Sequence, residues 1–267
     1  MGLRVIASDL DGTFLTPDGL VTDLNRRAVL EAREAGVRFV VATGRPVRWL
    51  GVLDDLADAD PLVVCSNGAM LYDVGRHEVL LRRGMPAGSV AEIAADLRRA
   101  IPGVRFALER GDLFGCESGT PLLGAREPGT IEAGLDELLD RVNPVVKLLV
   151  VHPTLCSDDL IADAEAVVGD RAVVTHSLTH DRFGMLELSA PGVTKAALLA
   201  EVCGSVGVAA EDVVAFGDMP NDLAMLRWAG RGLVTADAHR TLREEFDTVG
   251  SNADSGVGRA ILALLGR

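Results

Sequence analysis

Residues 3–13 read LRVIASDLDGT, a short apolar run followed at once by two aspartates and a glycine. We predict a buried strand over residues 3–10. Residues two apart in extended backbone point the same way, so Asp9 and Asp11 are expected to converge at the carboxyl end of this strand. Turn chemistry alone explains an Asp and a Gly at a strand end, but not a pair of carboxylates.

The paired carboxylates also carry a chemical implication. Two neighbouring carboxylates repel each other, which raises the pKa of one of them unless a cation intervenes. This arrangement suits an ionised nucleophile beside a group that carries protons. Gly12 has no Cβ, so the backbone can approach an anion closely. The motif therefore predicts a reactive site at the edge of the sheet where open α/β proteins bind ligands.

Apolar runs and helical patterns alternate in the first part of the chain, up to residue 65, and again from residue 194 onward. The predicted strands cover 37–42, 62–65, 213–216 and 232–235. The predicted helices cover the segment from the N-cap Thr22 to the C-terminal Gly36, a segment that begins near Pro46, and residues 194–206, 220–228 and 258–265. This order predicts an α/β fold with a Rossmann-like parallel-sheet core in three α/β/α layers.

Residues 83–187 break that rhythm. We predict a hairpin that leaves the sheet over 70–82, and a capping box, Ser89-Val90-Ala91-Glu92, that opens a helix to about Ala100. Further predicted segments are strands over 104–108 and 144–151 and helices over 131–139 and 157–168. The sequence thus predicts two domains, a core of residues 1–82 and 188–267 and a second α/β domain, 83–187, inserted into it.

The charge of the chain restricts its partners. The formal net charge is -13 and the sequence pI is about 4.8, so nucleic acid and anionic membrane surfaces are not expected as partners. No apolar run approaches the roughly 18 residues of a membrane span. The same charge repels phosphorylated metabolites at long range. A site for such a metabolite must therefore supply its own positive charge, from a metal or from a well-placed Lys or Arg.

Cysteine usage and the N-terminus predict a cytoplasmic protein. None of the 4 cysteines forms a C-x-x-C pair, so we expect neither a structural zinc site nor a disulfide framework. Asp9 interrupts the N-terminal apolar run before a secretory signal core can form. The sequence leaves open whether the protein is a monomer or a homodimer.

Two further positions combine a strand or helix end with a polar side chain. Thr43 follows a predicted strand, where its hydroxyl and the amides after it, with Gly44, could hold phosphate oxygens; helix capping is the alternative. Lys195 stands at a predicted helix start, a position that disfavours cations. One interpretation is that its ammonium binds a phosphate oxygen and an attacking carboxylate. The other is a solvated side chain. The only other lysine, Lys147, is predicted on an exposed face or an edge strand.

A last motif, GDMPND at residues 217–222, follows the predicted strand 213–216. The strand delivers Asp218, and Asp222 follows one helical turn later. Oxygen ligands without nearby His or Cys favour Mg²⁺, which takes one or two carboxylates together with phosphate and water. The predicted site therefore gathers acids, a threonine and a lysine at the carboxyl ends of successive parallel strands or in the helices after them.

The combination of motifs resembles the haloacid dehalogenase superfamily, and most closely the Cof-type phosphatases with a large C2-type cap. The resemblance covers essentially the whole chain. It rests on the segments DLDGTFL (9–15), ATGR (42–45), SNGA (66–69), GVTK (192–195) and GDMPNDLAML (217–226). It implies a Mg²⁺-dependent phosphatase for a small phosphorylated metabolite, such as a sugar phosphate, flavin mononucleotide or pyridoxal phosphate, with residues 83–187 as the cap that shapes substrate choice.

The resemblance also implies a role for each motif residue. Asp9 would attack phosphorus to form a phospho-aspartate, and Asp11 would protonate the leaving alcohol and then deprotonate the hydrolytic water. Thr43 and Asn221, with Gly12 and Gly44, would hold phosphate oxygens, and Lys195 would neutralise Asp9 and the phosphoryl group. The metal would bind the Asp9 carboxylate, the Asp11 backbone carbonyl and Asp218, with Asp222 in or near that shell.

One segment departs from the pattern of related sequences, which usually read Ala-Met-Gly-Asn-Ala where this chain has Val234-Thr235-Ala236-Asp237-Ala238. The departure puts the local loop contacts and the role of Asp237 in doubt, but not the reaction. A polar cluster at His180, Asp181 and Arg182 is interpreted as a solvated loop.

Other functions fit parts of the same pattern. A phosphomutase of the superfamily would share the aspartate pair but move phosphate within a sugar. A phospho-acceptor such as a receiver domain also uses Asp, Thr, Lys and Mg²⁺. Two features argue against it: Asp11 would speed loss of the phosphoryl group, and a simple receiver domain does not need the inserted residues 83–187. ATPase-like relatives have Thr in place of Asp11, and a catalytically inactive binding protein would be expected to lack one of the assigned groups.

Overall fold

The computed structural model describes residues 2–122, 127–176 and 183–267. Its chain divides into two compact units. One unit combines Met1–Leu81 with Thr194–Arg267, and the other is the continuous segment Arg82–Val193. Each unit has its own sheet and hydrophobic core.

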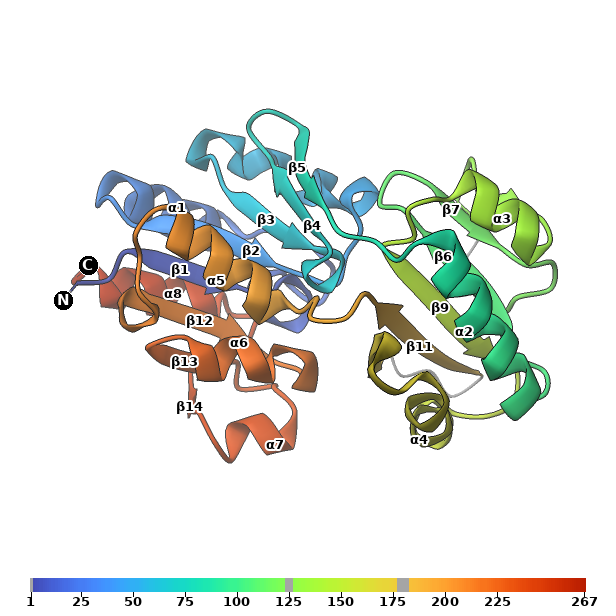
Figure 1. Ribbon diagram of the computed structural model, residues 1–267. Coiled ribbons are helices and arrows are strands. Elements are labelled where there is room, and N and C mark those ends of the chain that lie inside the picture. Colours follow the sequence, from blue (N-terminus) through green and yellow to red (C-terminus); the bar gives the residue numbers. More distant parts are fainter. Residues whose placement is uncertain (1, 123–126, 177–182) are drawn as a thin grey trace. The chain divides into compact units, whose positions relative to one another are not determined.

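The first unit is built on an eight-stranded sheet in the order β14-β13-β12-β1-β2-β3-β4-β5 (Figure 1). Its strands are β1 (Val5–Ser8), β2 (Arg38–Ala42), β3 (Leu62–Cys65), β4 (Met70–Asp73), β5 (Glu78–Arg82), β12 (Val213–Gly217), β13 (Arg231–Val234) and β14 (Asp247–Thr248). β1 pairs in parallel with both β12 and β2, with Ser8 level with Phe216 and Val41. The three central strands therefore end at the same edge of the sheet.

Helices cover both faces of this sheet, as the three-layer prediction requires. They are α1 (Asp23–Glu34), α5 (Lys195–Ser205), α6 (Leu223–Trp228), α7 (Arg240–Arg243) and α8 (Gly256–Leu264). α5 and α6 pack with Val5, Ala7 and Ala215 of the central strands in one cluster, while α1 and α8 pack together on the opposite face. The predicted start of α1 is confirmed, because the Thr22 hydroxyl accepts a hydrogen bond from the Asn25 amide (3.1 Å).

Two predictions for the first unit need correction. The hairpin of β4 and β5 does not leave the sheet; β4 pairs antiparallel with β3 and the hairpin extends the sheet to its edge. The segment after Pro46, Val47–Ala59, is a 3₁₀ helix, and Pro46 stands at its N-cap position rather than in its first turn. Neither difference displaces the strand ends that follow β1, β2 and β12.

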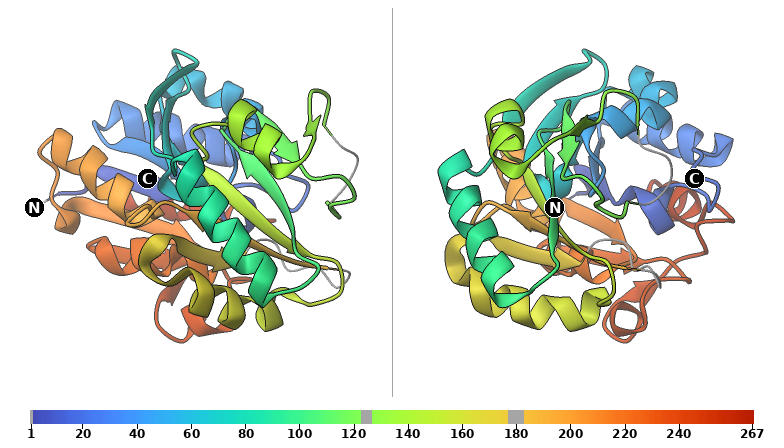
Figure 2. Two further views of the ribbon diagram at one scale, coloured as in Figure 1. Left: turned by 45° about the vertical axis from the view of Figure 1, so that its right-hand side comes forward. Right: turned by 90° about the vertical axis from the view of Figure 1, so that its right-hand side faces the viewer.

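The second unit holds a six-stranded sheet in the order β10-β11-β9-β6-β7-β8. Its strands are β6 (Arg105–Glu109), β7 (Phe114–Cys116), β8 (Ile131–Glu132), β9 (Lys147–His152), β10 (Val173–His176) and β11 (Gly184–Ser189). The helices α2 (Ala87–Ala100), α3 (Leu135–Arg141) and α4 (Ser157–Val168) cover one face and share a core with Phe106, Leu148 and Leu186 (Figure 2). No helix within the described residues has the length and apolar character needed to cross a membrane.

Three expectations for this unit are wrong. The capping box at Ser89 does not form, because α2 already begins at Ala87 with Pro86 as its N-cap. The pattern over 131–139 contains a short strand before the helix, which begins only at Leu135. Lys147 lies buried in an inner strand, where its charge pairs with Glu187 at 2.8 Å. The cluster at His180, Asp181 and Arg182 lies outside the described residues.

Candidate active site

Asp9 directly follows β1, the strand between β12 and β2. Its amide donates to the Phe216 carbonyl at 3.0 Å, which continues the parallel pairing for one more residue. The Asp9 side chain is buried. The sheet thus holds a carboxylate at the edge where parallel strands end and where open α/β sheets bind ligands.

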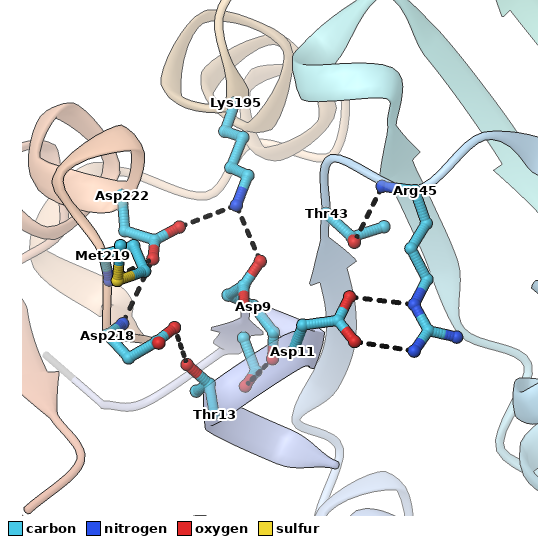
Figure 3. A network of polar contacts seen from close by, with 10 residues as sticks. Asp9, Asp11, Thr13, Thr43, Arg45, Lys195, Asp218, Met219 and Asp222 are labelled. Atoms are coloured by element: carbon cyan, nitrogen blue, oxygen red, sulfur yellow. Dashed lines mark hydrogen bonds and ion pairs between the residues drawn. The ribbon is translucent and has the colours of Figure 1, made fainter. Parts of the chain in front are cut away.

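Lys195 reaches this carboxylate from the first turn of α5 (Figure 3). Its Nζ donates to Asp9 Oδ1 at 2.6 Å and to Asp222 Oδ1 at 2.7 Å. The Thr194 hydroxyl caps the helix, and a Cβ at Gly68 would overlap the Thr194 carbonyl. A cation at a helix start is unfavourable in itself. The position of Lys195 is explained by the two buried carboxylates with which it pairs, those of Asp9 and Asp222.

The loop after β12 carries the other two acids of the site. Asp222 Oδ2 accepts from the backbone amides of Asp218 and Met219, both at 3.1 Å, so both of its oxygens are engaged. Asp218 Oδ1 accepts from the Thr13 hydroxyl at 2.8 Å. Gly12 has φ of 78°, and a Cβ there would overlap the Asp218 carboxylate. The glycine is therefore required for the loops after β1 and β12 to approach each other.

The three carboxylates of Asp9, Asp218 and Asp222 form one buried group, with an oxygen from each lying within 4.8 Å of the others. Burial raises the pKa of Asp9 well above its ordinary value, and the charges of Asp222 and Asp218 raise it further despite Lys195. Burial and the charge of Asp222 likewise raise the pKa of Asp218 to about 6. Burial opposes the charge of Lys195, but Asp222 and Asp9 outweigh it and raise its pKa. The group has more negative charge than one ammonium neutralises.

The Asp11 carboxylate lies outside that group and points toward Arg45 (Figure 3). Arg45 Nε donates to Asp11 Oδ2 at 2.8 Å and Arg45 Nη2 to Asp11 Oδ1 at 2.6 Å. β1 ends at Ser8 and the chain turns at Gly12, which has φ of 78°, although Asp9 (φ -66°, ψ 164°) and Asp11 (φ -77°, ψ 123°) each keep an extended backbone. The expectation that the two carboxylates converge is wrong, because Asp9 pairs with Lys195 in the buried acidic group whereas Asp11 pairs with Arg45 outside it.

Thr43, Gly44 and Asn221 have simpler surroundings. Thr43 is buried, and its hydroxyl accepts from the Arg45 amide at 3.1 Å; it does not cap the next helix, which begins at Val47. Gly44 follows Thr43 and is half-buried. Asn221 lies exposed in the 3₁₀ turn Pro220–Asp222, directly before the buried Asp222.

Sequence reasoning gave no role to three residues that the structure places in this network. Thr13 and Arg45 hold the carboxylates of Asp218 and Asp11, respectively. The backbone N–H of Asn67 donates to the Thr43 carbonyl at 3.0 Å, from a left-handed backbone conformation with φ of 56°. Arg45 carried a usable signal, since a guanidinium next to an acidic site matches a carboxylate geometrically. Neither Thr13 nor Asn67 could be assigned a partner without the fold.

The segment that departs from related sequences touches the site only through its backbone and Thr235. The Thr235 hydroxyl donates to the Gly12 carbonyl at 3.2 Å and so ties the end of β13 to the loop after β1. Asp237 is exposed, and no hydrogen bond between its side chain and the acidic group is present among the described contacts.

A model of the haloacid dehalogenase-like hydrolases matches residues 6–261. The chain belongs to this family. The resemblance inferred from the motifs is thereby confirmed. The acid, lysine and threonine positions described above are this hydrolase's candidate active site.

Two curated relatives match this hydrolase along nearly their whole length. The pyridoxal phosphate phosphatase YbhA of Escherichia coli is 28% identical, over 99% of this chain and 100% of its own. The 5-amino-6-(5-phospho-D-ribitylamino)uracil phosphatase YcsE of Bacillus subtilis is 26% identical, over 97% of this chain and 94% of its own. The structure of SMU.1108c from Streptococcus mutans superposes with a TM-score of 0.83 at 22% identity and covers 100% of both chains, which shows a common fold.

Proposed function

We propose that this hydrolase removes phosphate from a small phosphorylated metabolite through a phospho-aspartate on Asp9, with Mg²⁺ as cofactor. One observation carries the proposal: Lys195 holds Asp9 at 2.6 Å within a buried group of three carboxylates at the carboxyl edge of a parallel sheet. A buried carboxylate beside a fixed cation is placed to attack an electrophile. The named activities of relatives that match along the whole chain support the same reaction class.

The acidic group fits a divalent cation. Three carboxylates and the Lys195 ammonium leave an excess of negative charge, and all the donors are hard oxygens, as Mg²⁺ prefers. We propose that the carboxylates of Asp9 and Asp218 and the backbone carbonyl of Asp11 hold the ion. When bound, it would neutralise charge on the transferring phosphoryl group.

Asp222 has a different role in this proposal. One of its oxygens accepts from Lys195 and the other from two backbone amides, so both carboxylate oxygens already accept hydrogen bonds from the protein. We propose that Asp222 orients Lys195 and shapes the loop that presents Asp218, and contacts the ion at most through water.

The proposed reaction uses the remaining residues in two steps. An Asp9 carboxylate oxygen forms a bond to phosphorus while the bond from phosphorus to the substrate oxygen breaks, and Asp11 gives its proton to the leaving alcohol. Asp11 then accepts a proton from water, whose oxygen displaces Asp9 and releases inorganic phosphate. Lys195, Thr43 and Asn221 with the backbone at Gly12 and Gly44 would hold phosphoryl oxygens, which is the electrostatic stabilisation that phosphoryl transfer needs.

We propose that the second unit, Arg82–Val193, selects the substrate, because the site residues assigned above all lie in the first unit. A panel of phosphorylated metabolites tests the function directly. It should include pyridoxal phosphate, flavin mononucleotide, a phosphorylated ribitylaminouracil and several sugar phosphates. Release of inorganic phosphate that requires Mg²⁺ is the expected result. Transfer of phosphate within a sugar without release, or a stable phosphoprotein, would instead support a mutase or a phospho-acceptor.

Thr13→Val is expected to lower Mg²⁺ affinity by about 10–100-fold, because the Asp218 carboxylate loses the hydroxyl that orients it. Titration calorimetry of the free protein measures this effect without any substrate. Thr13→Ser keeps the donor and should bind Mg²⁺ like the parent. Unchanged affinity in the valine variant would show that the loop backbone alone orients Asp218.

Stabilisation by Mg²⁺ is expected to depend on pH. The pKa of Asp218 is raised from its ordinary value of 3.8 to about 6 in the folded, metal-free protein, so folding takes up a proton between these two pH values. The contribution of Asp218 to metal-free stability is therefore lost as pH rises through about 6. Mg²⁺ must displace those protons, so its affinity should fall as pH drops below about 6. Thermal melts with and without Mg²⁺ should show a larger shift at about pH 7.5 than at about pH 5. Equal shifts at the two pH values would contradict this assignment.

A further inference from the structure

Arg45 makes a two-point contact with Asp11 that the reaction scheme leaves unexplained. The two nitrogens that face Asp11 donate one to each carboxylate oxygen, at 2.8 and 2.6 Å. This is the fork-to-fork geometry that gives arginine–carboxylate pairs their directional strength. Arg45 is itself held from a third side, because its Nη1 donates to the Trp49 carbonyl at 3.3 Å.

The contact matters because Asp11 stands close to the acids that would hold a cation. It lies two positions after Asp9 in the same loop, and its negative charge is one of those that act on Asp218. A divalent cation attracts any carboxylate that can reach it, and a carboxylate bound to the ion can no longer serve a leaving group. A site with this many acids therefore needs a means of keeping one of them apart.

We propose that Arg45 is a positioning residue that holds the Asp11 carboxylate outside the metal-binding group of Asp9, Asp218 and Asp222. The guanidinium occupies both Asp11 oxygens and directs them away from that group (Figure 3). Asp11 thus stays off the ion, and one of its oxygens must leave the guanidinium before it can carry a proton to a leaving group. The inference rests on the proposed function, but its test measures metal binding and requires no turnover.

Arg45→Met removes the contact and retains a side chain of similar length. The released Asp11 should then join the ion as an additional carboxylate ligand. Ca²⁺ takes more oxygen ligands than Mg²⁺, which keeps several waters, so an extra ligand favours Ca²⁺. We expect the ratio of Ca²⁺ affinity to Mg²⁺ affinity to rise on the order of tenfold, measured by calorimetry on the substrate-free protein.

Two variants separate ligation from the loss of a positive charge. Arg45→Met combined with Asp11→Asn should return the Ca²⁺ to Mg²⁺ ratio to the parent value, because the additional carboxylate is gone. Arg48→Met removes a neighbouring arginine that stacks on Trp49, and it should leave the ratio unchanged. Arg45→Lys keeps a cation beside Asp11 and should stay near the parent ratio, with the single-point contact that an ammonium allows.

An unchanged ratio in Arg45→Met would overturn the inference, as would a rise that persists in the double variant. Thermal melts establish that each variant is folded, and Arg45→Gln replaces the methionine variant if that one is not. If none of the phosphorylated metabolites in the panel is hydrolysed, the Ca²⁺ and Mg²⁺ affinities of these variants still test the role of Arg45. Conversely, an active phosphatase with an unchanged ratio would reject only the role of Arg45.

Discussion

Asp9→Asn is expected to reduce phosphate release by about 10⁴–10⁶-fold, the range seen when a hydrolase loses its nucleophile or the group that activates it. The amide cannot form the phospho-aspartate, although it has nearly the same shape. Rapid acid quenching with a radiolabelled substrate should trap label on the parent protein and none on the variant. Hydroxylamine should release the label, since it cleaves acyl phosphates.

The stability of this variant provides a second measurement. Burial and the neighbouring acids raise the pKa of Asp9, so its negative charge is unfavourable in the metal-free fold. A neutral amide removes that repulsion, and Lys195 keeps its partner Asp222. The melting temperature without metal should equal or exceed that of the parent. Asp18→Asn, an exposed acid nearby in the chain, is the matched control and should retain full turnover. Comparable turnover in Asp9→Asn would reject Asp9 as the nucleophile.

Lys195→Met should impair both activity and folding. The substitution leaves the carboxylates of Asp9 and Asp222 buried without their cation, and breaking such a pair costs about 3–5 kcal/mol of unfolding free energy. Turnover should fall by about 10²–10³-fold, because the phosphoryl charge also loses a fixed counter-charge. Urea unfolding measures the first effect and phosphate release the second.

Two controls make the lysine result specific. Mg²⁺ can neutralise the buried negative charge that Lys195→Met leaves without a counter-ion, so it should restore more stability to this variant than it adds to the parent. Lys147→Met also breaks a buried ion pair, that with Glu187 at 2.8 Å, but it lies in the other unit and Mg²⁺ should not restore its stability. Equal rescue of both variants by Mg²⁺ would show that the ion does not act at the Lys195 site.

Backbone elements follow from the sequence more directly than the partners of side chains do. The strand 62–65 and the helix 157–168 were predicted with their observed bounds, because burial and capping patterns are local. Lys147 was misplaced because charge alone suggested exposure, whereas a partner on the neighbouring strand β11 permits burial. The capping box at Ser89 was equally plausible locally, but the helix begins earlier, at Ala87.

The sequence by itself determined the α/β class, the family, and which acids, lysine and threonine follow the ends of strands, because hydrophobic periodicity and motif spacing encode local backbone and burial. The tertiary structure alone decided the partners. Lys195 meets Asp9 across 186 positions of sequence, and Thr13 meets Asp218 across 205. The Asp11 carboxylate meets Arg45 instead of the buried acids, across 34 positions of sequence. Such pairings depend on how distant loops approach at one sheet edge, and no local pattern records that approach.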